Sequence, residues 1–204
     1  MQTRPAHREG VFQTFKTFHD PVLEGMLGEA ELFVSELPWK KRPAFLATMM
    51  GGPCEDARSI VPRWLSFLGQ SGTGKTFLSQ LIFEQAARVT ALKASALVLS
   101  PIRKFFWPRL LSRLRDGEYW LVRELADCNF VFLDELSLEH DPSGFGADKL
   151  CEILSCRVGK WTLLTSNLSM EKLGDVDGRI SSRLRRGGSV VVEVETVDFN
   201  LRAK

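Results

Sequence analysis

After Pro62, short apolar runs alternate with longer runs in which apolar residues recur at helical spacing. The longer runs at 76–89 and 149–158 predict helices, the second with Val158 on its apolar face. The short apolar runs predict strands at 64–68, 94–99, 129–133, 161–165 and 190–194. Apolar strands that alternate with helices are typical of an α/β fold with a parallel sheet covered on both faces.

The first 60 residues follow a different pattern. Residues 1–10 are polar, and 11–39 reads as helical with a break at Pro21. Apolar residues form two stripes there, with one at Phe12, Phe15 and Phe18 and another at Leu23, Met26, Leu27, Leu32 and Phe33. The stripes either pack on the main domain or dock a partner. We therefore divide the chain into a helical N-terminal extension and linker, 1–60, and a main domain, 61–204.

Composition excludes several classes of protein. The 204 residues are 44% hydrophobic and 25% charged, with a net charge of +2, which is ordinary for a globular domain and excludes a polybasic nucleic-acid coat. We find no apolar run long enough to cross a membrane and no apolar signal core. The four cysteines form no CxxC pair, which argues against a zinc site. We expect a cytoplasmic protein with no membrane partner.

The segment GQSGTGKT at 69–76 fits the phosphate-binding pattern GxxxxGK[ST], with a predicted strand before it and a predicted helix after it. Glycines allow successive N–H groups to point at phosphate oxygens, and the start of the helix adds its dipole. Lys75 supplies a cation for the β- and γ-phosphates, and the Thr76 hydroxyl can bind Mg²⁺. The predicted nucleotide-binding residues are Gly69, Gln70, Ser71, Gly72, Thr73, Gly74, Lys75 and Thr76.

The apolar strand that begins near Phe130 delivers two acids, Asp134 and Glu135, to the same edge of the sheet. Adjacent acids at the end of an apolar strand are costly unless a cation or water uses them. Asp134 is expected to hold Mg²⁺ through water, and Glu135 to polarise the attacking water. Together with the loop at Gly69, the pair predicts nucleotide binding and hydrolysis.

Two further elements follow in the sequence. Asn167 follows the predicted strand 161–165 and Ser166. An amide at this position could orient water or the γ-phosphate, although such an Asn is often only a turn residue. Arg179 and Arg183 are four residues apart and so share one helix face. They could complete the phosphate site of a neighbouring subunit or simply form a solvated basic face.

In this order, the motifs resemble the DnaC/IstB-like branch of AAA+ ATPases over about residues 64–202. The resemblance implies a three-layer P-loop NTPase of the ASCE type, with a five-stranded parallel sheet of order 5-1-4-3-2. It also implies ATP with Mg²⁺ and side-by-side assembly of subunits. The implied roles are Walker A for Lys75 and Thr76, Walker B for Asp134 and Glu135, sensor 1 for Asn167, arginine finger in trans for Arg183, its companion for Arg179, and a terminal nucleotide-site arginine for Arg202.

The chain departs from that family at both ends. Too few residues follow the predicted strand 190–194 for a full helical lid, so we expect little or no lid. Loaders usually carry a separate helicase-binding domain, whereas about 60 residues precede the first predicted strand here.

Residues 101–115 hold five basic residues, no acid, and three aromatic side chains. Basic groups can follow DNA phosphates while aromatic rings stack on bases. The candidate DNA-binding residues are Arg103, Lys104, Phe105, Arg109 and Arg113. The alternative is a solvated cationic face with buried aromatic residues.

These observations predict an ATP-hydrolysing helicase loader or replication accessory protein that acts with single-stranded DNA and a replicative helicase. One alternative is an IstB-like transposition helper ATPase. Another is a nucleotide-gated adaptor with little hydrolysis, against which the intact Glu135 argues.

Overall fold

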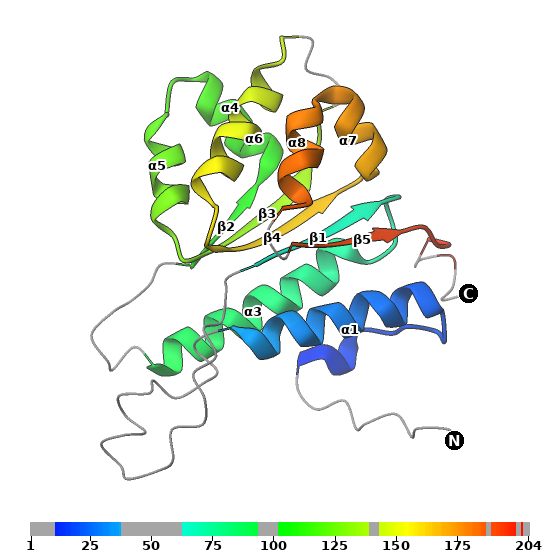
Figure 1. Ribbon diagram of the computed structural model, residues 1–204. Helices are drawn as coiled ribbons and strands as arrows, with labels where there is room; N and C mark the ends of the chain where they lie inside the picture. Colours follow the sequence, from blue (N-terminus) through cyan, green and yellow to red (C-terminus); the bar gives the residue numbers. More distant parts are fainter. Residues whose placement is uncertain are drawn as a thin grey trace.

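The computed structural model describes residues 11–37, 63–93, 102–138, 143–186, 189–198 and 201. Its centre is a five-stranded parallel sheet in the order β2-β3-β4-β1-β5 (Figure 1). The strands are β1 Trp64–Gly69, β2 Ile102–Phe106, β3 Phe130–Leu136, β4 Trp161–Ser166 and β5 Val190–Val194. Read from the other edge, this is the predicted order 5-1-4-3-2, which is confirmed.

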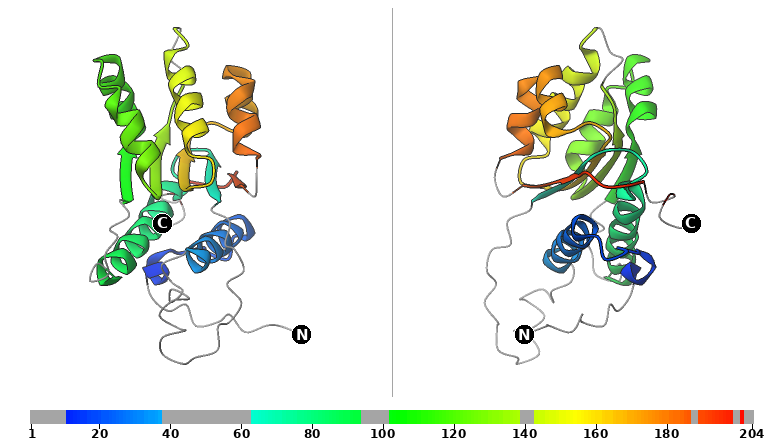
Figure 2. Two further views of the ribbon diagram at one scale, coloured as in Figure 1. Left: turned by 60° about the vertical axis from the view of Figure 1, so that its left-hand side comes forward. Right: turned by 90° about the vertical axis from the view of Figure 1, so that its right-hand side faces the viewer.

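Helices cover both faces of the sheet and make three layers (Figures 1 and 2). One face carries η1 Val11–Thr14, α1 Pro21–Glu36 and α3 Lys75–Lys93. The other carries α4 Trp107–Arg115, α5 Trp120–Asp127, α6 Phe145–Cys156, α7 Met170–Val176 and α8 Gly178–Leu184. None of the described helices combines the length and the apolar character needed to span a membrane.

The two apolar clusters of the core lie on opposite faces of the sheet. Every residue of β1 and β4 is buried, as expected for central strands that have helices above and below. Polar side chains needed for chemistry are therefore left to the ends of these strands, which is where the candidate site lies.

Most residues of the two N-terminal apolar stripes pack inside the molecule. The Asp20 carboxylate caps α1 by accepting a hydrogen bond from Val22 N at 2.8 Å, and Pro21 takes the first helical position. The second stripe is buried against α3 and the sheet, except for Leu32, which is 46% exposed; in the first stripe Phe18 is exposed. These two residues therefore do not share the packing of their stripes. Partner docking by 1–60 stays a prediction.

The second strand also differs from the sequence prediction. The predicted strand 94–99 lies outside the described residues, and β2 runs along the edge of the sheet at Ile102–Phe106, paired with β3. At Trp107 the chain passes directly into α4, so Arg103, Lys104 and Phe105 belong to a strand.

The helix predicted to end at Val158 ends at Cys156, and Val158 is exposed because the chain has already turned away. The next residue after the helix, Arg157, is fully buried. Its guanidinium donates hydrogen bonds to the carbonyls of Leu125 (2.9 Å), Cys128 and Trp161 and to Thr162 Oγ1 (3.2 Å). Burial lowers the pKa of Arg157 to about 10. This side chain therefore ties the end of α5 to the start of β4.

Candidate functional site

The loop between β1 and α3 has the curled backbone that the sequence predicts. Gly69, Gly72 and Gly74 have φ angles of 116°, 76° and 87°, a region that favours glycine. A Cβ on Gly69 would also stand 2.5 Å from the Val194 carbonyl oxygen, so a larger residue would push against β5. Of the remaining loop residues, Gln70 and Ser71 are exposed and Thr73 is buried.

The Lys75 side chain folds back into this loop. Its ammonium donates to Gly69 O at 2.8 Å, to Gln70 O, and to Thr73 Oγ1 at 3.3 Å. Only 4% of the residue is exposed, and burial lowers the pKa of Lys75 to about 8. The lysine is thus a buried cation held by two loop carbonyls and a hydroxyl, which suits an anionic ligand in the loop.

Asp134 lies beside the start of α3. Its Oδ1 accepts hydrogen bonds from Thr76 Oγ1 at 3.1 Å and from Thr165 Oγ1 at 2.7 Å. A hydroxyl and a carboxylate oxygen this close together fit a hard cation such as Mg²⁺, which prefers oxygen ligands. The two residues predicted for the metal are therefore neighbours in space.

Glu135 has a left-handed backbone, with φ of 62°, and its side chain is exposed. The pairing of β3 with β4 shifts register between Leu133 and Leu136, so a bulge turns Glu135 out of the strand. Its backbone N–H donates to Thr165 Oγ1 at 2.8 Å. One hydroxyl thus holds both acids, a role for Thr165 that the sequence analysis missed. The signal that could have found it is the strand order, which places the end of β4 beside the acids of β3.

Lys104 also reaches Asp134. Its ammonium lies 3.1 Å from Asp134 Oδ2 and donates to Gln80 Oε1 at 2.8 Å. It also stands 4.7 Å from the centre of the Phe132 ring. The sequence analysis placed Lys104 on a DNA surface, whereas the structure places it at the acidic pair.

The other candidate DNA-binding residues have varied surroundings. Arg103 pairs with Glu124 at 3.0 Å, and Arg113 pairs with Glu118 at 2.6 Å. Arg109 is exposed on α4, while Phe105 is half-buried against the core.

Asn167 is exposed directly after β4. Arg179 and Arg183 lie on α8, and Arg179 is held by Asp177 and Asp148, each at 2.6 Å. Arg183 donates to Ser155 Oγ at 3.0 Å. Arg202 lies outside the described residues, as does nearly all of the segment after Asp198 that could hold a lid.

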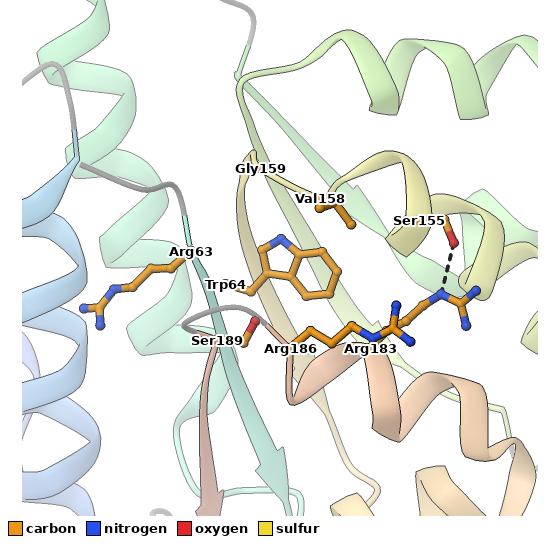
Figure 3. A pocket seen from close by; sticks show the side chains of 8 residues that line it. All are labelled: Arg63, Trp64, Ser155, Val158, Gly159, Arg183, Arg186 and Ser189. Carbon is orange, nitrogen blue, oxygen red and sulfur yellow. Dashed lines mark hydrogen bonds between the residues drawn. The ribbon is translucent and has the colours of Figure 1, made fainter. Parts of the chain in front are cut away.

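Arg183 lines a pocket of about 300 Å³ together with Trp64, Val158 and Arg186. Figure 3 shows Arg183 and Arg186 close together there, with the guanidinium of Arg63 turned away toward α1. Trp64 begins β1, whereas Gly69, at the other end of that strand, begins the phosphate loop. The structure thus brings the phosphate loop, Asp134, Glu135 and Thr165 together at the carboxyl ends of the strands. Arg183 lies at the opposite, amino ends of the strands.

No family profile matches the chain, and no curated protein matches it in sequence. Solved structures match it in fold. A DnaI structure has a TM-score of 0.63 at 18% identity, over 92% of this chain and 91% of that chain. The DnaC helicase loader has a TM-score of 0.62 at 16% identity, over 86% of this chain and 92% of that chain. The chain has a DnaC-like AAA+ fold.

Domain III of the Thermotoga maritima replication initiation protein DnaA shares this AAA+ fold. It matches with a TM-score of 0.56 at 16% identity, over 89% of this chain and 66% of that chain. At such identities the likeness shows the fold alone.

Proposed function

We propose that this chain is an ATPase of the helicase-loader type that acts on single-stranded DNA with a replicative helicase. The observation that carries the ATPase proposal is that Lys75, Thr76, Asp134 and Glu135 lie at the carboxyl ends of β1 and β3, with Thr76 bonded to Asp134. Ligands of open α/β folds bind at this edge, and the glycine loop offers backbone N–H groups for phosphate.

Each residue has a chemical task in this proposal. Lys75 exchanges its loop carbonyls for phosphate oxygens, and Thr76 with Asp134 would hold Mg²⁺. When bound, the ion offsets negative charge on the phosphate oxygens. Glu135, turned out of the strand, accepts the proton of the attacking water, and Asn167 orients that water or the γ-phosphate.

Arg183 acts on the ATP of a neighbouring subunit. Its position at the amino end of β1, away from the chain's own phosphate loop, supports action in trans. A guanidinium at the γ-phosphate stabilises charge in the transition state, so hydrolysis depends on assembly. Arg179 is the companion of Arg183: two carboxylates hold it, and it thereby fixes the position of α8.

The DNA part of the proposal is supported by the outer surface of α4 and α5. Arg109 is exposed on α4, and Tyr119 and Trp120 are 54% and 56% exposed nearby in the chain. Arg113 lies 5.5 Å from the centre of the Trp120 ring. Cations beside open aromatic rings can bind the backbone and bases of single-stranded DNA. The fold shared with the DnaC helicase loader supports a helicase partner.

Phosphate release with and without single-stranded DNA tests the proposal. Lys75→Ala should bind no ATP, whereas Glu135→Gln should bind ATP normally and lose at least a hundredfold in turnover. Glu135→Gln protein with ATP should also retain a replicative helicase from host extract, since its ATP state persists.

The outcomes separate the alternatives. Slow phosphate release by the wild-type protein that Glu135→Gln leaves unchanged would favour a nucleotide-gated adaptor. Preference for duplex DNA and retention of a transposase would favour a transposition helper. Failure to bind magnesium-ATP would remove the ATPase proposal itself.

A further inference from the structure

Lys104 places a positive charge against the carboxylate that faces the candidate metal position. The contacts divide the two Asp134 oxygens: Oδ1 is used by Thr76 and Thr165, and Oδ2 lies 3.1 Å from the Lys104 ammonium. The lysine can therefore remain beside Asp134 when the Thr76 side of the carboxylate faces a metal ion.

The surroundings of Lys104 favour a fixed position. Gln80 of α3 accepts its hydrogen bond and in turn donates to Glu84 at 3.1 Å, and the Phe132 ring lies beneath the ammonium. Gln80 belongs to α3, and Phe132 and Asp134 belong to β3. The three partners of the ammonium are therefore held in place by elements of the core layers. Only 31% of the side chain is exposed, so solvent screens its charge only in part.

We propose that Lys104 is a tethered cation that shares Asp134 with bound Mg²⁺ and thereby sets how strongly nucleotide binding depends on the metal. The inference rests on the proposed ATPase function and adds a residue to its site. Without metal, Lys104 offsets the negative charge of Asp134 and so reduces the repulsion between that carboxylate and the triphosphate. With metal, the same ammonium repels Mg²⁺.

Removal of this charge therefore has two opposite effects. In Lys104→Met, which keeps an apolar stem over Phe132, metal-free nucleotide binding weakens, while the Mg²⁺ concentration needed to restore it falls. A residue that merely oriented Asp134 would, when lost, weaken both metal-free binding and metal binding. The signs of the two shifts thus distinguish a charge effect from a structural one.

The experiment follows binding of a fluorescent, non-hydrolysable ATP analogue in EDTA and then during a Mg²⁺ titration. For Lys104→Met we expect about threefold to tenfold weaker binding in EDTA and about a threefold to tenfold lower Mg²⁺ midpoint. Lys104→Arg should resemble the wild type in both measurements. Arg123→Met, which removes an exposed cation from α5, is the matched control and should change neither.

Each result has one meaning when circular dichroism shows the variants folded. Unchanged values in Lys104→Met, or two shifts in the weakening direction, would overturn the inference and leave the ATPase proposal standing. An Arg variant that behaves like the Met variant would overturn it too. A wild-type protein that binds no analogue, with or without Mg²⁺, would remove the proposed function and this inference with it.

Discussion

At the scale of single residues, hydroxyl groups decide where the charged groups of the site stand. Thr165 Oγ1 donates to Asp134 and accepts from the backbone of Glu135, so one buried oxygen fixes the positions of two acids. The Thr76 hydroxyl donates to the same Asp134 oxygen, Oδ1, as Thr165 does. A small change at such a hydroxyl should therefore affect turnover without any change in net charge.

Thr165→Val tests this role. The substitution keeps the shape of the side chain but leaves the Glu135 N–H and Asp134 Oδ1 without that partner. We expect turnover to fall about tenfold to a hundredfold, because Glu135 is no longer held, and stability to fall by about 1–2 kcal/mol. ATP binding should change little. Steady-state phosphate release measures the effect, and Thr165→Ser, which keeps the hydroxyl, is the control; equal turnover in Val and wild-type proteins would contradict it.

Lys75 predicts a pH dependence of nucleotide binding. Its pKa is lowered to about 8 in the free protein, and a bound phosphate raises it again by attraction. The protonated form binds, so affinity should be constant below about pH 7.5 and fall as pH rises, reaching about a tenfold loss at pH 9. Calorimetry in buffers with different heats of ionisation should detect proton uptake on binding near pH 8.5. An affinity that stays flat from pH 7 to 9.5 would exclude this titration.

At the scale of elements, the fold depends on connections between strand and helix ends. Arg157 joins the end of α5 to the start of β4 through carbonyls that these ends would otherwise leave unsatisfied. In the described part of the chain, the guanidinium donates to backbone carbonyls and to the Thr162 hydroxyl, so dipoles stabilise its charge. Arg157 lies far from the phosphate loop, so its contacts contribute to the stability of the fold and not to nucleotide binding.

Arg157→Met should lower the free energy of unfolding by about 3–5 kcal/mol, because the buried carbonyls lose their donors and the replacement cannot supply any. Guanidinium chloride unfolding followed by circular dichroism measures the loss. Arg123→Met on the exposed face of α5 should stay within about 0.5 kcal/mol of the wild type. Two variants of equal stability would show that Arg157 is not such a connection.

The same elements show how far the sequence could predict the structure. The central strands β1 and β4 are buried on both faces, so their apolar runs predicted them to within a residue. The valine-rich edge strand β5 was predicted at its observed bounds. The edge strand β2 was missed because two of its five residues, Arg103 and Lys104, are charged, and a partly polar strand has no apolar run. The glycine loop and the two acids were placed by motif. Lys104 and Thr165 needed the pairing of β2 and β4 with β3, which no local pattern contains.

At the scale of the whole molecule, the sheet separates two kinds of positive charge. Lys75 and the loop stand at the carboxyl end of β1, while Arg183 and Arg186 stand beside Trp64 at its amino end. Subunits arranged side by side can bring one end against the other, so that an active site would consist of two chains.

Mixing two inactive variants tests shared sites. Arg183→Ala keeps its own phosphate loop and acids, and Glu135→Gln keeps its arginine, so mixed assemblies contain sites with both groups intact. We expect each variant alone to release phosphate at least tenfold more slowly than the wild type, and an equal mixture to recover up to about a quarter of wild-type turnover. A mixture no faster than its components, with assembly shown by light scattering, would contradict action in trans.

The left-handed backbone at Glu135 bears on how the protein would evolve in the laboratory. Glycine adopts a φ of 62° without steric cost, whereas a residue with a long side chain is strained there. A library screened only for resistance to heat should therefore gain glycine or asparagine at this position, and each such gain should silence hydrolysis. Screens of this protein for robustness need to be paired with a screen for catalysis, or they will enrich well-folded proteins that no longer turn over.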